Sequence, residues 1–391
     1  MVIGGSISGL FAALFLRRSG WRVDVFERTE TQLTGRGAGI VTHPELSEML
    51  GAAGLNAGPD FGIEIAGRKM LDRAGRMIGD HPRRQLVTSW DRVYRMLSDG
   101  LPAECYHIRK ELIRIEEREN RVIAHFVDGP RDGELLIGAD GFRSTVRAQC
   151  LAEAQPNYAG YVAWRGLVME SALSDDARRE IFDSMIFFLP PREQILGYPV
   201  AGVDNDLRPG HRRYNFVWYR PADDDGGLRD LLTDDSGTMH PLSIPPPLIR
   251  KTTIDAFRDA AEQLLPPQLR EVVKLAPQPF LQPIYDLTSP KMAIGRVAII
   301  GDAAFVARPH VGAGVTKAAQ DAQALAQALR TERDIEHALQ NFERARMPVN
   351  RRIVERGREL GAYLAAGASI AEPPTSKAVM EDIAMLDFLH G

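Results

Sequence analysis

Cysteine is nearly absent from this chain of 391 residues, which holds only Cys105 and Cys150. Two cysteines this far apart match neither a disulfide framework nor the paired spacing of a structural zinc site. We therefore expect no metal site. A chain with free thiols also favours a reducing compartment, the cytoplasm.

Long apolar runs and an excess of basic charge are missing as well. No apolar run approaches the roughly 20 residues that span a bilayer, and the start lacks the charged segment and cleavage site of a signal peptide. The 48 Lys and Arg residues face 52 Asp and Glu, a formal net charge of −4. Because the positive charges are also scattered, we expect neither a nucleic-acid partner nor a membrane partner.

The beginning of the chain has the pattern of a strand, a glycine turn and a helix. Gly4 and Gly9 bracket the turn, and the apolar run 11–16 continues as a buried helical face. A second strand, 23–26, ends at Glu27, where the ribose of a dinucleotide would need an acceptor. Free N–H groups at the helix start suit a pyrophosphate. The pattern predicts dinucleotide binding, which a nicotinamide enzyme could share.

Two features of this start depart from the usual pattern. Ser6 replaces the middle glycine of GxGxxG, so the backbone must approach the phosphates past a small side chain. Only three residues precede Gly4, whereas a strand usually has about 5 to 6. This leaves open a native start upstream.

Two further strand ends carry an aspartate beside a glycine. The apolar run 135–139 leads into Asp140 and Gly141, and the run 296–300 leads into Gly301 and Asp302. Such strand ends are where an α/β sheet presents its ligand contacts. The alternative is that each strand simply ends in a solvated turn and binds no ligand.

A glycine-rich loop and a long helix follow the last strand. Pro309 and the run 312–314 precede a helix of small and apolar residues over 315–329. Its N-terminal N–H groups and dipole would favour a negative charge by about 1 kcal/mol.

The middle of the chain differs, because the runs 161–168, 184–189 and 213–219 are rich in strand formers. They predict a mostly antiparallel sheet, which a helix near 248–265 covers.

Together, these motifs resemble the para-hydroxybenzoate-hydroxylase-like class of flavin-dependent aromatic monooxygenases. The resemblance rests on GGSISG with Glu27, on GADGFRSTVR from Gly138, and on GDAAFVARPHVGAGVTKAAQDAQALAQAL from Gly301. It covers nearly the whole chain. The runs 37–41, 44–46, 88–91 and 308–310 are most similar to the branch that hydroxylates dihydroxypyridines.

The resemblance implies an α/β fold with a Rossmann-like FAD-binding domain, an inserted, mostly antiparallel substrate domain and C-terminal helices. The FAD-binding domain would comprise 1–62, 86–154 and 286–391, and the substrate domain 63–85 and 155–285. The cofactor-binding residues that it implies are Gly4, Ser6, Ile7, Ser8, Gly9, Glu27, Arg28, Gly39, Ile40, Asp140, Gly141, Asp302, Pro309, Gly312, Ala313, Gly314 and Val315.

Three positions depart from the broad family. Phe305 stands in place of a common histidine, Thr316 in place of asparagine, and Trp90 in place of an arginine that reaches the pyrophosphate. We interpret them as markers of the branch. The run 342–348 resembles a late element of the family, although it could also be an exposed, charged helix end.

The resemblance implies a chemistry in two halves. NADH or NADPH would reduce FAD, and the reduced flavin would bind O₂ as a hydroperoxide that hydroxylates a small hydroxylated aromatic, a dihydroxypyridine in this branch. The protein must position the ring and exclude water. The family also implies a homodimer.

A base near the substrate hydroxyl would help the reaction. His310, in the loop before the glycines, is the first candidate for this catalytic role and His43 the second, although either could be a satisfied buried histidine. The weaker candidates are His211, His240, Tyr198 and Tyr214. Arg165 could pair with an anionic substrate or form a surface salt bridge.

Two other functions stay open. The same chemistry could act on a phenol or on an acylpyridine that loses its side chain. The chain could also hold a flavin without hydroxylating anything, although a binding module would not need this glycine-rich loop.

Overall fold

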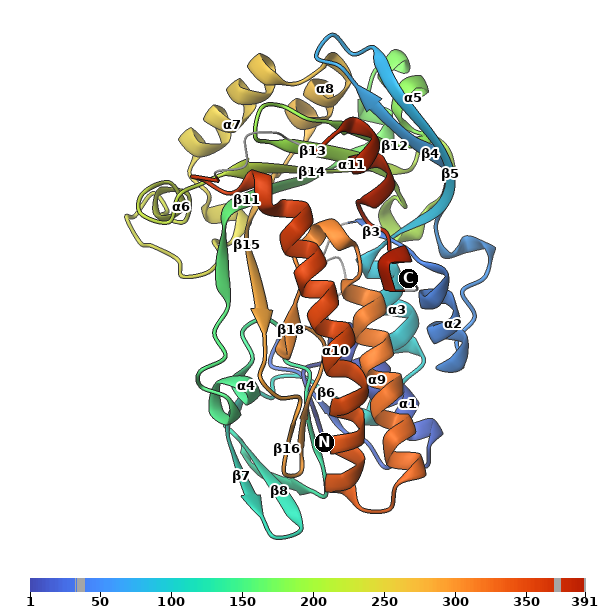
Figure 1. Cartoon of the computed structure of the whole chain (residues 1–391), viewed down its shortest axis with the longest axis vertical. Coiled ribbons are helices and arrows are strands. Elements are labelled where there is room, and N and C mark those ends of the chain that lie inside the picture. The colour runs from blue at the N-terminus through green and yellow to red at the C-terminus, as the bar shows by residue number, and fades with distance from the viewer. Residues whose placement is uncertain (32, 34–38, 369–373, 390–391) are drawn as a thin grey trace.

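The computed structural model describes residues 1–31, 33, 39–368 and 374–389. Gly37 and Ala38, which belong to one of the branch motifs, therefore lie outside the described residues. Figure 1 shows an elongated molecule whose lower part holds the N-terminus and whose upper part holds α5 to α8. The long helix α10 (Ile335–Gly361) runs beside the lower part toward the upper part.

A six-stranded sheet forms the core of the lower part. Its inner strands pair in parallel, and only the edge strand β16 is antiparallel. The strands in spatial order are β16 (Ala293–Ile294), β17 (Val297–Ile299), β10 (Leu136–Gly138), β1 (Val2–Ile3), β2 (Val25–Phe26) and β6 (Tyr106–His107). The strands β17, β10, β1 and β2 are buried along their whole length and show no polar alternation, as is typical of a parallel sheet covered on both faces. The predicted Rossmann-like domain is confirmed.

A nine-stranded sheet forms the upper part. It is antiparallel apart from the pairing of β12 with β4, which confirms the predicted mostly antiparallel sheet. The strands in spatial order are β18 (Phe305–Val306), β15 (Phe280–Thr288), β11 (Asn157–Met169), β14 (Arg213–Pro221), β13 (Gln194–Val200), β12 (Ser184–Phe188), β4 (Ile63–Leu71), β5 (Met77–Ser89) and β3 (Gly39–Val41).

This sheet reaches past the segments 63–85 and 155–285. The strands β5 and β15 run on to Ser89 and Thr288, and β3 and β18 come from the loops next to the glycine turns. These strands run between the two parts without a break, and a continuous strand carries no local signal of where its neighbours change. A separate three-stranded meander consists of β7 (Leu112–Arg118), β8 (Arg121–Phe126) and β9 (Gly129–Gly133).

The helices cover the sheets and separate them. The helix α7 lies within the predicted range 248–265 and packs on one face of the upper sheet, where Phe257 stacks on Trp164 with ring centroids 4.4 Å apart. The helices α1, α9 and α10 pack side by side against the lower sheet. The remaining bounds are α1 (Ile7–Arg18), α2 (Pro44–Ala52), α3 (Trp90–Asp99), α4 (Thr145–Cys150), α5 (Asp175–Ile181), α6 (Gly227–Leu231), α7 (Lys251–Leu264), α8 (Pro267–Leu275), α9 (Gly314–Thr331) and α11 (Ser376–Asp382).

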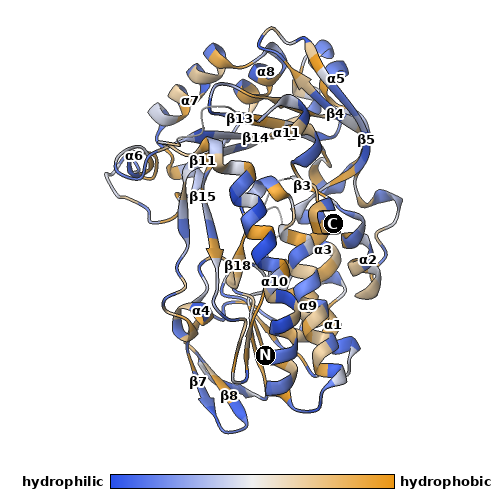
Figure 2. Ribbon diagram, viewed as in Figure 1, coloured by the Kyte–Doolittle hydropathy of each residue, from blue (hydrophilic) through white to orange (hydrophobic). Residues whose placement is uncertain are grey.

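A buried cluster of charges joins α9, α10 and the end of β17. The carboxylate of Asp321 accepts hydrogen bonds from Arg346 Nε at 2.8 Å, Asn350 Nδ2 at 3.0 Å and the Gly301 amide at 3.2 Å. In the same helix as Arg346, Glu343 accepts from the amides of Met292 and Ala293. The run 342–348 is therefore packed into the fold at these two residues, although Figure 2 draws much of α10 in the hydrophilic colour.

No helix in the described ranges is both long and apolar enough to cross a membrane.

Candidate functional site

Two cavities lie where the glycine turns meet the sheets. The outer cavity, of about 210 Å³, is lined by residues from the ends of β1, β2 and β10, among them Gly4, Glu27 and Asp140. The main cavity, of about 450 Å³, lies between the upper sheet and the loop 306–315. Asp302 lines the main cavity, and the lower sheet therefore contributes to both.

The turn after β1 requires glycine at both of its ends. Gly4 has φ +102°, and a Cβ there would lie 2.4 Å from the carbonyl oxygen of Ala139. A Cβ on Gly9 would lie 1.9 Å from the carbonyl oxygen of Gly4. Ser6, which stands between them in place of glycine, has an extended backbone and lines the outer cavity. The serine is thus accommodated without a left-handed conformation.

Glu27 and Asp140 stabilise this corner through main-chain contacts. Buried Glu27 accepts from the Gly5 amide at 2.8 Å and from the Thr29 amide at 3.0 Å. Each carboxylate oxygen keeps lone pairs for a further donor. Arg28 is exposed at the rim of the outer cavity. We expected Glu27 to meet a ribose, and the structure adds that it fixes the turn.

Asp140 has a local role that its predicted place beside the dinucleotide did not suggest. Its carboxylate accepts from the amides of Thr145 at 2.7 Å and Val146 at 3.1 Å, and from the Ser144 hydroxyl. It therefore satisfies the start of α4, where amides have no helical partner. Burial raises its pKa, which these hydrogen bonds oppose. Gly141, at φ +75°, follows it along the wall of the outer cavity.

Two helix starts point their free amides at this region. The first helical bond of α1 runs from Leu10 N to Ser6 O, so the amides of Ile7, Ser8 and Gly9 precede it. In α9 the corresponding bond runs from Lys317 N to Ala313 O. The amides of Gly314, Val315 and Thr316 therefore have no partner within the helix, whereas the amide of Gly312 donates to the Pro309 carbonyl. The loop residues that line the main cavity are Gly312, Ala313, Gly314 and Val315.

The side chain of Asp302 is exposed to the main cavity. Desolvation by the surrounding protein raises its pKa, the nearby cation of Lys317 lowers it, and Asp321 raises it again. Lys317 itself is fully buried, 3.8 Å from Asp321. The charges of Lys317 and Arg346 thus balance those of Asp321 and Asp302.

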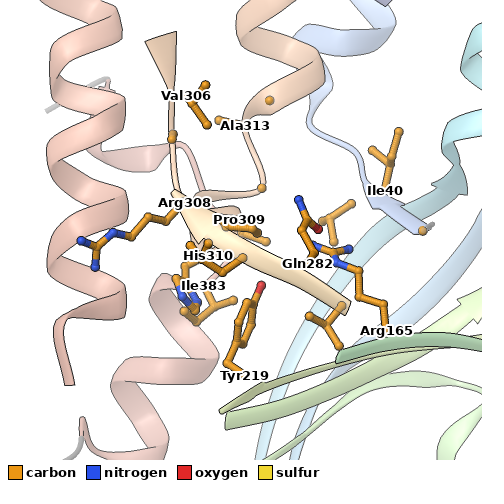
Figure 3. A pocket seen from close by; sticks show the side chains of 18 of the residues that line it. Ile40, Arg165, Tyr219, Gln282, Val306, Arg308, Pro309, His310, Ala313 and Ile383 are labelled. Carbon is orange, nitrogen blue, oxygen red and sulfur yellow. The ribbon is translucent and has the colours of Figure 1, made fainter. Parts of the chain in front are cut away.

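His310 belongs to the wall of the main cavity (Figure 3). Its Nε2 lies 2.9 Å from the Tyr161 hydroxyl, and its ring lies 4.3 Å from that of Tyr219 between centroids. Burial, with the charges of Arg308 and Arg165, lowers its pKa to about 3. At neutral pH the ring is therefore uncharged.

His43 has a different setting from the one we expected. It is buried at the start of α2 and is not among the residues that line the main cavity. Its Nε2 donates to the Ala384 carbonyl at 3.2 Å, and its Nδ1 lies 3.5 Å from the Thr316 hydroxyl. Burial lowers its pKa. The ring contacts the last part of the chain, which the sequence could not place.

The four weaker candidates for the base differ in whether they line the main cavity. Only Tyr198 lines the main cavity, beside Gly39. His211 and His240 lie near Asp206 and Asp234 away from it. Tyr214 faces the opposite side of the sheet and packs on Phe182. A sequence gives no means of choosing between the two faces.

Arg165, which we expected to pair either with an anionic substrate or with a surface carboxylate, lines the main cavity. It extends from β11 into the cavity beside Gln282 and Tyr219 (Figure 3). No hydrogen bond or ion pair holds its guanidinium within the described part of the chain. Arg308, by contrast, points away to Asp286 at 3.0 Å. A surface salt bridge for Arg165, one of our two expectations, is therefore not formed with any described residue.

The cavities, the paired helix starts and Asp302 fit a dinucleotide with a flavin ring. The outer cavity is bounded by Glu27 and the Gly4 turn, as an adenosine half requires. The main cavity is bounded by the glycine loop and Ile40, with room for a planar ring and a small ligand. Gly314 has no atom near the place of a Cβ, so its backbone is open to the cavity. This arrangement defines a flavin-dependent enzyme class.

Comparison with known proteins leads to the same class. Residues 2–62 match a family described as NAD(P)-binding Rossmann-like domain, residues 158–286 one described as FAD binding domain-like, and residues 282–357 one described as FAD binding domain.

The full-length relatives are aromatic monooxygenases. The chain is 34% identical over 370 residues to 2,6-dihydroxypyridine 3-monooxygenase of Paenarthrobacter nicotinovorans, across 94% of this chain and 92% of that protein. It is 29% identical over 413 residues to 3-amino-4-hydroxybenzoate 2-monooxygenase of Streptomyces cremeus, across 100% and 94%. The solved structure of 2,6-dihydroxypyridine-3-hydroxylase from Arthrobacter nicotinovorans superposes with a TM-score of 0.88 and 33% identity, across 97% and 95%. The chain therefore belongs to the FAD-dependent aromatic monooxygenases, as its motifs indicated, and FAD is its cofactor.

Two glycines at opposite ends of α1 provide a test of the FAD turn. We expect Gly20→Ala to lower the free energy of unfolding by about 1 to 2 kcal/mol, because Gly20 has positive φ, and Gly4→Ala to lower it by more, because its added Cβ also meets backbone. Only Gly4→Ala also clashes, with Ala139, so it alone should raise the Kd for FAD by about tenfold or more. Gly20 has open space around it. Flavin fluorescence titration measures the Kd, and equal FAD affinity in the two variants would contradict the assignment.

The neutral state of His310 predicts a pH dependence of stability. Its folded pKa is about 3, whereas the unfolded value is about 6.5. Between these values only the unfolded chain binds the proton. The wild type should therefore lose stability relative to His310→Gln as the pH falls below about 6.5, by up to about 1.4 kcal/mol per pH unit. Urea unfolding of both proteins from pH 8 to pH 5 checks this, and a constant difference would refute it.

Proposed function

We propose that the protein hydroxylates a small, anionic dihydroxypyridine with FAD, O₂ and reduced nicotinamide. The observation that carries this proposal is the guanidinium of Arg165 in the main cavity, to which no residue of the described ranges is paired. The relatives named above support the reaction class, and one of them is named for a dihydroxypyridine.

An anionic substrate would balance the positive charge of Arg165 in the main cavity. Burying a cation without a partner is costly, so a half-buried arginine in a cavity favours an anion there. Hydroxylated pyridines lose a proton more readily than simple phenols, and their planar oxygen and nitrogen edges match the fork of a guanidinium. The buried Tyr219 has its pKa raised to about 12, so it stays neutral beside Arg165. The remaining charge in this part of the cavity is positive.

FAD supplies the hydride acceptance and oxygen activation when it is bound, and the chain supplies binding, orientation and proton management. We propose that the residues predicted from the motifs hold FAD, with Asp302 at the sugar chain and the loop 312–315, including the free amides of Gly314 and Val315, at the ring. His310 would face the substrate as a neutral hydrogen-bonding partner. A pKa near 3 makes it a weak base, so we assign the stabilisation of the substrate anion to Arg165. His43 would act indirectly, through Ala384.

The remaining features are proposals that rest on the family and the composition. The nicotinamide donor is NADH or NADPH, the division into FAD-binding and substrate segments follows the boundaries given above, and the protein is a cytoplasmic homodimer. Light scattering of the purified protein measures the assembly state.

The function is tested by nicotinamide oxidation in the FAD-loaded protein against a panel of hydroxypyridines, acylpyridines and phenols. Product and hydrogen peroxide are both quantified. We expect 2,6-dihydroxypyridine to stimulate oxidation with one hydroxylated product per nicotinamide consumed. Coupled turnover of a phenol or an acylpyridine alone would replace the substrate, and peroxide alone with every compound would indicate a flavin protein without hydroxylase activity.

Arg165 variants test the proposed charge pairing. We expect Arg165→Met to raise the Kd of the anionic substrate by about 10- to 100-fold, because a charge-assisted hydrogen bond is worth about 1.5–3 kcal/mol. Arg165→Lys should recover part of the affinity, since it keeps the charge but loses the fork. Arg114→Met, on exposed β7, is the control. Titration by flavin absorbance measures the Kd, and equal losses for an uncharged ring analogue would contradict charge pairing.

A further inference from the structure

A fully buried arginine holds the last described segment of the chain against the upper sheet. Arg68, on β4, is 0% exposed. Its guanidinium donates to the carbonyl oxygens of Met380 at 2.8 Å and Ile383 at 2.6 Å, and to Gln85 Oε1 at 2.7 Å. Within the described ranges no carboxylate forms an ion pair with it. Since a buried cation needs these acceptors, the segment 376–386 is bound to one position.

The same segment is bound to the loop that faces the flavin. The amide of Ala384 donates to the His310 carbonyl at 2.6 Å, and its carbonyl accepts from His43. Ala384 has φ +55°, a conformation that costs an alanine about 1–2 kcal/mol. A Cβ on Gly312 would lie 2.8 Å from the Ala384 Cβ. The contacts on both sides maintain this strained residue.

Through these contacts the segment supplies one wall of the main cavity. Ile383 and Ala384 line it, and Figure 3 shows Ile383 close to His310. Ile383 also packs in the cluster with Tyr198 and Tyr219. Its side chain is buried, so it occupies volume that a larger ligand would need.

We propose that Ile383 limits the size of the ring that the enzyme accepts, and that Arg68 is a positioning residue that holds Ile383 in place. The proposal rests on the proposed function for the class of substrate, a single planar hydroxylated ring. Because Arg68 holds its segment in place, the side chain of Ile383 cannot move aside, and it would clash with a substrate ring that carries added carbon atoms. The discrimination available from one methylene group in an apolar pocket is about 10- to 200-fold.

Ile383→Ala tests the wall directly. The selectivity is the ratio of kcat/KM for 2,6-dihydroxypyridine to that for a dihydroxypyridine carrying an added ethyl group. We expect Ile383→Ala to lower this ratio at least tenfold and Ile383→Val to lower it less. Ile113→Ala, on exposed β7, is the control that should leave it unchanged. An unchanged ratio in Ile383→Ala would overturn the proposal.

Arg68→Lys and Arg68→Met test the positioning role, with Arg84→Met as the control on the neighbouring strand. Arg84 is exposed and pairs with Glu64. We expect Arg68→Met to speed proteolytic cleavage within 376–389, to change the visible circular dichroism of the bound flavin and to lower the selectivity ratio. Arg68→Lys should show the same changes to a smaller degree, and it serves as the test if Arg68→Met does not fold. Wild-type values for Arg68→Lys in all three measurements would overturn the role of Arg68.

Failure of the two proposals can be told apart. If the wild type turns over neither compound, the proposed function fails. Equilibrium binding of the two compounds to the FAD-loaded Ile383→Ala protein then still measures the size limit. A tenfold gain in relative affinity for the ethyl compound supports the wall, and no gain refutes it.

Discussion

The carboxylate of Asp321 is the point at which the cofactor end of this molecule is held together. It is fully buried on α9 and accepts from Arg346 and Asn350 on α10 and from the amide of Gly301 after β17. The end of β17 and the two helices that follow it along the chain, α9 and α10, therefore share one charge. Since Asp302 follows Gly301 directly, the position of the cavity floor depends on this interaction. Removing one partner of such a buried pair costs about 3–5 kcal/mol, which makes the geometry rigid.

The two sheets contribute different kinds of ligand contact. The lower sheet presents turns whose glycines let the backbone come close to a dinucleotide, as at Gly4 and Gly9. The upper sheet presents side chains, because alternate residues of β13 and β14 face the main cavity together with Arg165 of β11. The first kind of recognition uses amides and helix dipoles, which suit phosphates and a reduced flavin. The second uses shape and charge, which suit a particular ring.

Arg165 contributes a positive charge to the main cavity. Burial, the charge of Arg308 and the charge of Arg165 lower the pKa of His310, and Arg165 opposes the rise that burial imposes on the pKa of Tyr198 and Tyr219. His310 stays neutral, and no described residue pairs with Arg165, which is why we propose an anionic substrate for this cavity. The start of α9 adds a positive dipole end from the other side. The charge of Arg165 would thus stabilise an anionic substrate, and the dipole of α9 would stabilise the reduced flavin.

The sequence by itself determined the local structure and the family. The strand, glycine turn and helix at the start, the acidic strand ends and the alternating runs of the middle all depend on neighbouring residues, so they were predictable from their order. It also indicated Asp302, His310 and the glycine loop, because motif spacing fixes them relative to β17.

Only the tertiary structure decided what those residues touch. His43 contacts Ala384, 341 residues away, and Arg68 contacts Ile383, 315 residues away. No periodicity within a segment reports such pairs. The same holds for Arg165, which pairs with no described residue, since whether a charge is paired depends on every element that packs around it. Nor could spacing show that Asp140 caps α4, because an aspartate before a short helix and one beside a ligand have the same local pattern. Contacts between distant segments, set by packing of the two sheets, completed the site.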